Sequence, residues 1–332
     1  MPMNGFPTLY DLAASVGVGD GANAKANQKI IELQAQTNDI FQVLPLKECN
    51  DGTKEKVVLR TSLPEVAWRM LNKGVKPSKS AAGEISFTTG GVEAIADIDE
   101  RQMQLNGNSN EYRMRENSGH QEAMTQKMCQ TLFYGDEKIN PAGFTGLGAY
   151  YYSFTQQDDI YKNQIVNAGG TGHKLTSLWI VTFGLDTIHG IYPKGVPAGY
   201  RYRDNGRVRV GDESGGSFWA YESQYNWDLG LAVRDPRYAV RLANIDTTQR
   251  DDTTFIAKLI DAMGRIQDPY KANTKTVILC NRDVRTYLRI LASEKKNVML
   301  NFADFMGKKL THLDDAPIIR NDAIMTTEEQ LV

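Results

Sequence analysis

The feature that most constrains this chain is a long helical segment that runs directly into a glycine-rich stretch. Six side chains of Glu111–Leu132 recur at three- and four-residue steps, which predicts one helix face: Met114, Ser118, Gln121, Met124, Met128 and Leu132. The stretch LFYGDEKINPAGFTGL, residues 132–147, follows at once. Its glycines and proline predict that the chain leaves the helix sharply and enters another layer.

This stretch contributes the candidate structural residues of the loop after the helix: Gly135, Pro141, Gly143, Phe144, Gly146 and Leu147. We expect Gly143 and Gly146 to act through backbone geometry, and a side chain at Gly143 should be destabilising if that position needs a positive φ. Phe144 and Leu147 are apolar, so we expect them to plug the core beneath the loop.

Residues 50–90 predict a long two-stranded excursion. KVVLRTSLPEVAWRML and GEISFTTG alternate and are rich in β-branched residues, and the polar, basic NKGVKPSKSAAG lies between them. An isolated hairpin is marginal in water, so this one needs a surface to lie against, such as another subunit. Arg60, Trp68 and Arg69 are the candidate contact residues.

The N-terminal segment predicts an arm. TLYDLAASV, residues 8–16, has the composition of a short helix, and a Gly/Asn-rich tether follows it. Leu9 and Leu12 are apolar side chains that such a helix has to bury. We therefore expect both to contact a neighbouring subunit or the inner face of an assembly.

The remainder predicts a strand block and then a helix–strand block. TSLWIVTFG, TIHGIYPKG, RYRDNGRVRV, SFWAYESQYNWDLGLAV and YAVRLANID read as strands within 176–245, and Asp-Asn-Gly predicts a hairpin turn at 204–206. After it come the helical TTFIAKLIDAMGRI, the strand KTVILC and a helix that Asn281 should cap. An extended stretch closes the chain.

Bulk properties describe an ordinary globular protein. The 332 residues are 41% hydrophobic and 23% charged, with a formal net charge of −2, so a general attraction to nucleic acid or anionic lipid is not expected. Three cysteines at wide spacings indicate reduced, buried thiols. The first 20 residues lack the pattern of a signal peptide, and no apolar run has membrane-span length.

The sequence carries no positive enzymatic signal. The four histidines lack metal-ligand spacing, so we expect neither a metal nor a cofactor, and no residue is assigned as catalytic. The glycine turn Gly169–Gly172 invites a phosphate-loop interpretation, but His173 separates its last glycine from Lys174 and Leu175 takes the hydroxyl position. A glycine turn before a strand is the simpler interpretation.

Several of these patterns together resemble the major capsid proteins of tailed bacteriophages, especially the short-tailed group. The helix followed by LFYGD and PAGFTGL is similar to that family's spine helix and the loop after it. The strand block SLWIVTFG to GLAVRDPRYAVRLANID, and the ending GKKLTHLDDAPIIRNDAIMTTE, resemble two further family segments. The order of these motifs is more specific than any one of them.

The resemblance implies an α+β tailed-phage capsid fold, with a peripheral domain, an axial domain, an extended hairpin loop and an N-terminal arm. Connections are expected to be reordered, because here the strand block precedes the helix–strand block. The expected division is arm 1–27, peripheral domain 28–45 and 97–248 with the spine helix at about 111–132, extended loop 46–96, axial domain 249–325 and tail 326–332.

The implied function is structural: a virion capsid protein, assembled in the host cytoplasm, that self-assembles as pentamers and hexamers into an icosahedral shell around phage double-stranded DNA. Implied partners are copies of itself, portal, scaffolding and decoration or cement proteins, and DNA through non-specific contacts, without a membrane. Two alternatives remain open: a cellular nanocompartment shell of the same fold, and a soluble nucleotide-binding enzyme using Gly169–Gly172.

Overall fold

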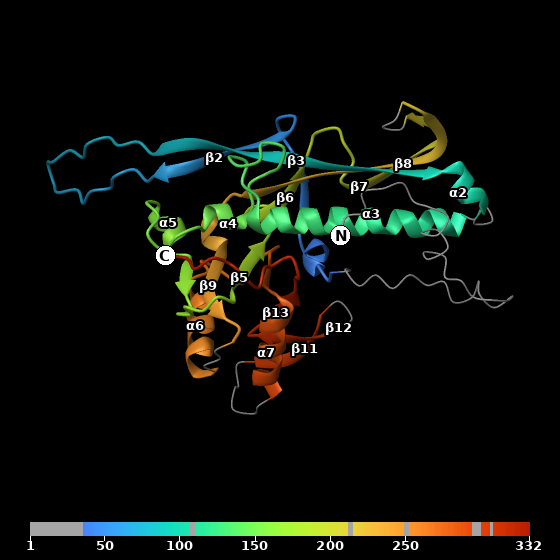
Figure 1. Cartoon of the computed structure of the whole chain (residues 1–332). Helices are drawn as coiled ribbons and strands as arrows, with labels where there is room; N and C mark the ends of the chain where they lie inside the picture. The colour runs from blue at the N-terminus through green and yellow to red at the C-terminus, as the bar shows by residue number, and fades with distance from the viewer. Residues whose placement is uncertain (1–35, 106–109, 212–214, 249–251, 294–299, 306–307) are drawn as a thin grey trace. The chain divides into compact units, whose positions relative to one another are not determined.

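The computed structural model describes residues 36–105, 110–211, 215–248, 252–293, 300–305 and 308–332. Gln36–Val332 forms a compact unit (Figure 1). The arm predicted at 1–27, including Leu9 and Leu12, lies outside the described residues.

The sheet runs in the order β11-β12-β13-β10-β5-β6-β8-β3-β2, with β9 beside β5, β4 beside β9, β7 beside β8 and β1 beside β6. Its strands are β1 (Leu46–Glu48), β2 (Lys54–Ser62), β3 (Ala81–Asp99), β4 (Ile165–Asn167), β5 (Leu175–Phe183), β6 (Ile188–Tyr192), β7 (Gly199–Gly211), β8 (Ser217–Val233), β9 (Ala239–Asp246), β10 (Lys275–Cys280), β11 (Leu300–Phe305), β12 (Lys308–Leu313) and β13 (Ala316–Arg320). Every residue of β5 is buried, as expected for a strand at the centre of a sheet covered on both faces.

The helices are α2 (Glu100–Leu105), α3 (Asn110–Tyr134), α4 (Leu147–Tyr150), α5 (Asp159–Lys162), α6 (Asp252–Gly264) and α7 (Arg282–Ser293), with 3-10 turns η2 (Asp39–Gln42) and η3 (Pro236–Tyr238). Figure 1 shows α3, the predicted long helix, lying along strands β3 and β8, which it contacts.

The buried face of α3 differs in part from the predicted one. Met124, Met128 and Leu132 are buried as expected, and Met124 packs with Ala96 of β3 and Tyr225 of β8. Ser118 and Gln121, which the sequence places on the same helix face, are exposed. The side chain of Met114 is not among those that the structure describes. Toward the start of the helix the buried contact is polar, because Asn117 Nδ2 donates to Ser223 Oγ.

The prediction of a hairpin turn at Asp204–Gly206 is wrong. Strand β7 continues through these residues and pairs with β8 on both sides of them, with Asp204 opposite Ser223 and Gly206 opposite Glu222. One residue, Asn205, is therefore inserted as a β-bulge, and Gly206 takes the positive φ of 72°. Asp-Asn-Gly has the backbone freedom for either structure, and the long partner β8 selects the bulge.

The C-terminal block shares the sheet of the strand block. β10 pairs antiparallel with β5 and parallel with β13, α6 packs beside β9 and β4, and α7 packs beside β11, β12 and β13. Asn281 caps α7 as predicted, since its Oδ1 accepts from the Val284 amide at 2.9 Å. The pairing of β5 with β10 joins segments on both sides of the boundary expected at 248.

The sheet is narrowest between β5 and β6, away from the expected boundary. β5 and β6 are paired through Phe183 and Ile188 alone. On one side lie β5, β9, β4 and β10–β13 with α6 and α7, and on the other lie β6, β8, β3, β2 and β7 with α3. Strand pairing therefore holds each half together much more strongly than it joins the halves.

Candidate functional site

The most exposed apolar segment of the described chain is the connection between β2 and β3. Paired residues of the hairpin extend from Lys54 opposite Thr88 to Ser62 opposite Ala81, with a register shift after Arg60. The segment beyond them lacks regular strand pairing. Trp68 is 101% exposed and Leu71 is 96% exposed. Water-exposed side chains of this size in one segment are typical of a surface that a partner covers.

Cations surround these apolar side chains. Between residues 60 and 80 the sequence has Arg60, Arg69 and three lysines against a single carboxylate, Glu65, and all of them are exposed. We call residues 63–80 the hairpin tip. Its lysines are Lys73, Lys76 and Lys79. A partner surface for the tip therefore has to combine apolar area with negative charge.

The sequence pattern predicted that residues 56–71 continue as a strand into the tip. If one face of such a strand packed on the protein, every second side chain would be buried. In the structure Leu63, Val66 and Leu71 are exposed together with Trp68. These three apolar residues were missed as contact candidates. The signal that could have found them is the Leu63-Pro64 step, because proline lacks the amide donor that continued strand pairing needs.

The loop after α3 is held by close backbone packing. The Gly135 amide donates to Thr131 O, and the Gly146 amide donates to Gly135 O at 2.9 Å. A Cβ on Gly146 would lie 2.3 Å from Thr131 O, and one on Gly135 would lie 2.4 Å from Phe144 O. Both positions need glycine because the backbone of the loop lies directly against the helix end.

Gly143 behaves differently from the expectation. It is absent from the described positive-φ residues, and a Cβ there would have its nearest contact at an ordinary 3.5 Å. Gly143 therefore does not need a positive φ, and Gly146, at φ −90°, does not use one either. Phe144 and Leu147 are both buried in the main core, whereas Pro141 is exposed.

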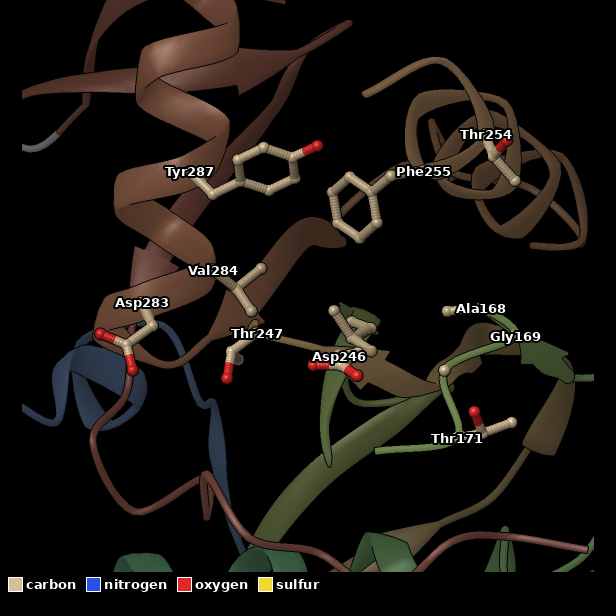
Figure 2. Close-up of a pocket in the computed structure, with 12 residues that line it drawn as sticks. Ala168, Gly169, Thr171, Asp246, Thr247, Thr254, Phe255, Asp283, Val284 and Tyr287 are labelled. Atoms are coloured by element: carbon tan, nitrogen blue, oxygen red, sulfur yellow. The ribbon is translucent and has the colours of Figure 1, made fainter. Parts of the chain in front are cut away.

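The glycine turn Gly169–Gly172 lines a pocket of about 490 Å³ between β9, α6 and α7 (Figure 2). The Gly169 amide donates to Asn167 Oδ1 and the Gly170 amide to Asn244 O, so these two donors are engaged within the protein. The described lining residues include the carboxylates of Asp246 and Asp283 and neither lysine nor arginine. A phosphate needs free amides or cations, so this arrangement disfavours nucleotide binding.

The thiols have the environment of inert core residues. Cys49, Cys129 and Cys280 are all buried and unbonded to one another. Burial raises the pKa of the Cys129 and Cys280 thiols to about 12, and burial with the nearby Glu55 raises that of Cys49 to about 11. Among the described residues no group of histidine, cysteine and carboxylate side chains could hold a metal ion. None of the described helices is long and apolar enough to cross a membrane.

Comparisons with known proteins agree with the sequence resemblance. Residues 21–332 match the family model of major capsid protein GP7. A cryo-EM structure of bacteriophage Epsilon15 has a chain that is 27% identical, with a TM-score of 0.76 over 100% of this chain and 99% of that one. The capsid of bacteriophage JBD30 is 8% identical, with a TM-score of 0.48 over 91% and 98%. No curated protein matches the sequence.

The family match covers nearly all of the chain, and the Epsilon15 similarity extends through the long helix, the hairpin and both halves of the sheet. This protein has the capsid fold of tailed bacteriophages in its mixed α+β form. It is a component of the virion, where copies of it form the shell. The chain belongs to the major capsid protein GP7 family of shell-forming structural proteins.

Proposed function

We propose that the chain assembles as pentamers and hexamers into an icosahedral shell that encloses phage double-stranded DNA, and that it acts without catalysis. The observation that carries the assembly proposal is the hairpin tip, where Trp68, Leu71 and Val66 are almost fully exposed. Covering apolar area stabilises an assembly by about 25 cal/mol per Å². Many symmetric copies of such a modest contact hold a closed shell.

In this proposal the hairpin tip and Arg60, Trp68 and Arg69 contact a neighbouring subunit, while Leu9 and Leu12 of the arm contact a neighbour or the inner face. The loop after α3 serves the subunit's own architecture. The near-neutral chain contacts DNA non-specifically. Portal, scaffolding and decoration proteins are the further partners we propose.

We also propose a domain division that follows strand pairing. The peripheral domain comprises α3 with β2, β3, β6, β7 and β8, and the axial domain comprises β4, β5 and β9 together with the C-terminal block. The single paired position between β5 and β6 supports this division. Relative to the expected boundaries, residues 165–183 and 239–248 move from the peripheral to the axial domain. Strand β2 and most of β3 move from the extended loop to the peripheral domain.

The test is a double substitution in the tip, Trp68→Ser with Leu71→Ser. Because both side chains are exposed, the free energy of unfolding of the unassembled subunit should change by no more than about 0.5 kcal/mol. Electron microscopy should show few or no shells. Tyr270→Ser is the matched control, since Tyr270 is also a large exposed side chain, 65% exposed, outside the hairpin.

Normal shells from the double variant would refute the role of the tip in assembly. Loss of shells in the Tyr270→Ser control as well would indicate a general loss of surface hydrophobicity. A nanocompartment shell is distinguished by the cargo of purified particles, which would be protein in place of DNA.

A further inference from the structure

The C-terminal strap, Met325–Val332, is fastened along its length although it forms little regular structure. Its one bridge pairs Glu328 with Leu175 of β5. The Met325 amide donates to the Tyr134 hydroxyl at 3.0 Å, and Met325 O accepts from Thr176 Oγ1 at 2.6 Å. In Figure 1 this segment, drawn in dark red, ends at the point marked C.

Glu328 is the centre of the strap's contacts. Its carboxylate accepts from the Tyr134 hydroxyl at 2.5 Å, from Ser177 Oγ at 2.5 Å and from Arg241 Nη2 at 2.9 Å. Tyr134 is the last residue of α3, Ser177 lies on β5 and Arg241 lies on β9. One carboxylate therefore joins the end of the long helix to two strands of the axial half.

The Glu328 carboxylate balances the charge of the buried Arg241 guanidinium. The Arg241 side chain is 8% exposed and that of Glu328 is 6% exposed, and the guanidinium lies 5.1 Å from the centre of the Trp179 ring. Removing either partner of a buried ion pair leaves an uncompensated charge in the interior. Docking of the strap and neutralisation of Arg241 are therefore coupled.

The far end of the strap has a second anchor. Asn244 of β9 accepts from the Leu331 amide at 2.9 Å and donates to Leu331 O at 3.0 Å. Val332 O accepts from Ser153 Oγ at 2.6 Å, in the loop between α4 and α5. Asn244 lies on the axial half and Ser153 lies beside it, whereas Tyr134 belongs to α3 of the other half.

We propose that the strap is a clasp that fixes the orientation of α3 relative to the axial strands, and that uniform shells require it to be docked. Strand pairing joins the two halves of the sheet only through Phe183 and Ile188. Apolar packing also joins them, since the Phe133 ring of α3 lies 6.4 Å from the Trp179 ring of β5, and the strap adds directional polar contacts at the end of the same helix. In a shell built from pentamers and hexamers of one chain, every subunit has to form closely similar contacts with its neighbours, so its two halves have to keep nearly the same orientation. The part of this inference that concerns shells rests on the shell-forming role.

The test compares Glu328→Gln with Glu329→Gln. The first keeps the size of the side chain, replaces one of the two acceptor oxygens with an amide donor and leaves Arg241 without its counter-charge. Glu329 is the exposed neighbour. Hydrogen exchange on unassembled subunits should be about tenfold faster or more across 325–332 and at the end of α3 in the first variant only. Electron microscopy should show shells of mixed size or open sheets from that variant and uniform shells from the control.

Unchanged exchange in Glu328→Gln would overturn the clasp, because the carboxylate would not hold the strap. Faster exchange with uniform shells would overturn the link to assembly. If this variant does not fold, Asn244→Gly releases the far anchor, accommodates the positive φ of 58° at this position and leaves the Arg241 ion pair intact, and the same two outcomes apply. Failure of the wild-type protein to form shells would contradict the shell-forming role, and the exchange comparison would still decide whether the strap is a clasp.

Discussion

His189 on β6 should make the subunit sensitive to mild acid. Its ring is fully buried, and burial, with Lys47 and Arg234 nearby, lowers its pKa from 6.5 to about 4, against an opposing effect of Glu55. The unfolded chain binds a proton as the pH falls through 6.5, and the folded chain does so only near 4. Stability is therefore highest above pH 6.5 and is lost as the pH falls through the interval between the two values.

The magnitude follows from the two pKa values. At 1.36 kcal/mol per pKa unit, the His189 contribution to unfolding free energy should fall by about 2 kcal/mol between pH 7 and pH 5 and by about 3 kcal/mol by pH 4. The assay is urea unfolding of the unassembled subunit across this range. His189→Leu is the comparison, because a leucine of similar volume at this buried position cannot titrate.

Carboxylates also titrate in this range, so the decisive quantity is the difference between the two proteins. The wild-type protein should lose about 2 kcal/mol more than His189→Leu between pH 7 and pH 5. Parallel stability curves would refute the reasoning and would mean that the folded protein accepts the His189 proton as readily as the unfolded chain does.

Three further predictions concern the loop, a helix cap and the arm. Gly146→Ala should destabilise the unassembled subunit by about 1–3 kcal/mol, because its Cβ would lie 2.3 Å from the backbone oxygen of Thr131. Gly143→Ala should change the thermal unfolding midpoint little. Equal effects of the two substitutions would contradict the close-packing argument. Asn281→Ala should lower the free energy of unfolding by about 1 kcal/mol or more, because it removes the α7 cap and the bond from Asn281 Nδ2 to Thr176 Oγ1. An unchanged urea midpoint would remove the cap's role. Residues 8–16 should exchange hydrogen fast in free subunits and slowly in shells; equal protection in both states would remove the arm assignment.

Local patterns in the sequence were sufficient for many elements. The helix α3, the strands β5–β9, the strand β10 and the capped helix α7 appear where period, β-branched content and the Asn281 cap predicted them. The same patterns were insufficient where a strand distant in sequence determines which of two locally allowed structures forms. Asp204–Gly206 fits a hairpin turn, but strand β8 extends past it and makes it a bulge.

Glycine roles in the loop after α3 illustrate the same limit. The sequence shows that the loop is rich in glycine, and positive φ is the usual reason for glycine in a turn. The structure gives a different reason, because Gly135 and Gly146 lie against the backbone of Thr131 and Phe144. Such contacts depend on how the loop folds back on the helix, and spacing along the chain does not encode them.

The sequence by itself indicated the family, through the resemblance of its ordered motifs, and determined the long helix, the main strands and the exposed, cation-rich hairpin through residue type and local period. Tertiary structure alone decided which strands share a sheet, where the sheet is narrow and what holds its halves together. Glu328 is one of several carboxylates near the end of the sequence, and only folding brings it to Tyr134, Ser177 and Arg241. The physical reason is that burial and charge pairing are properties of neighbours in space, which the chain acquires when distant segments meet.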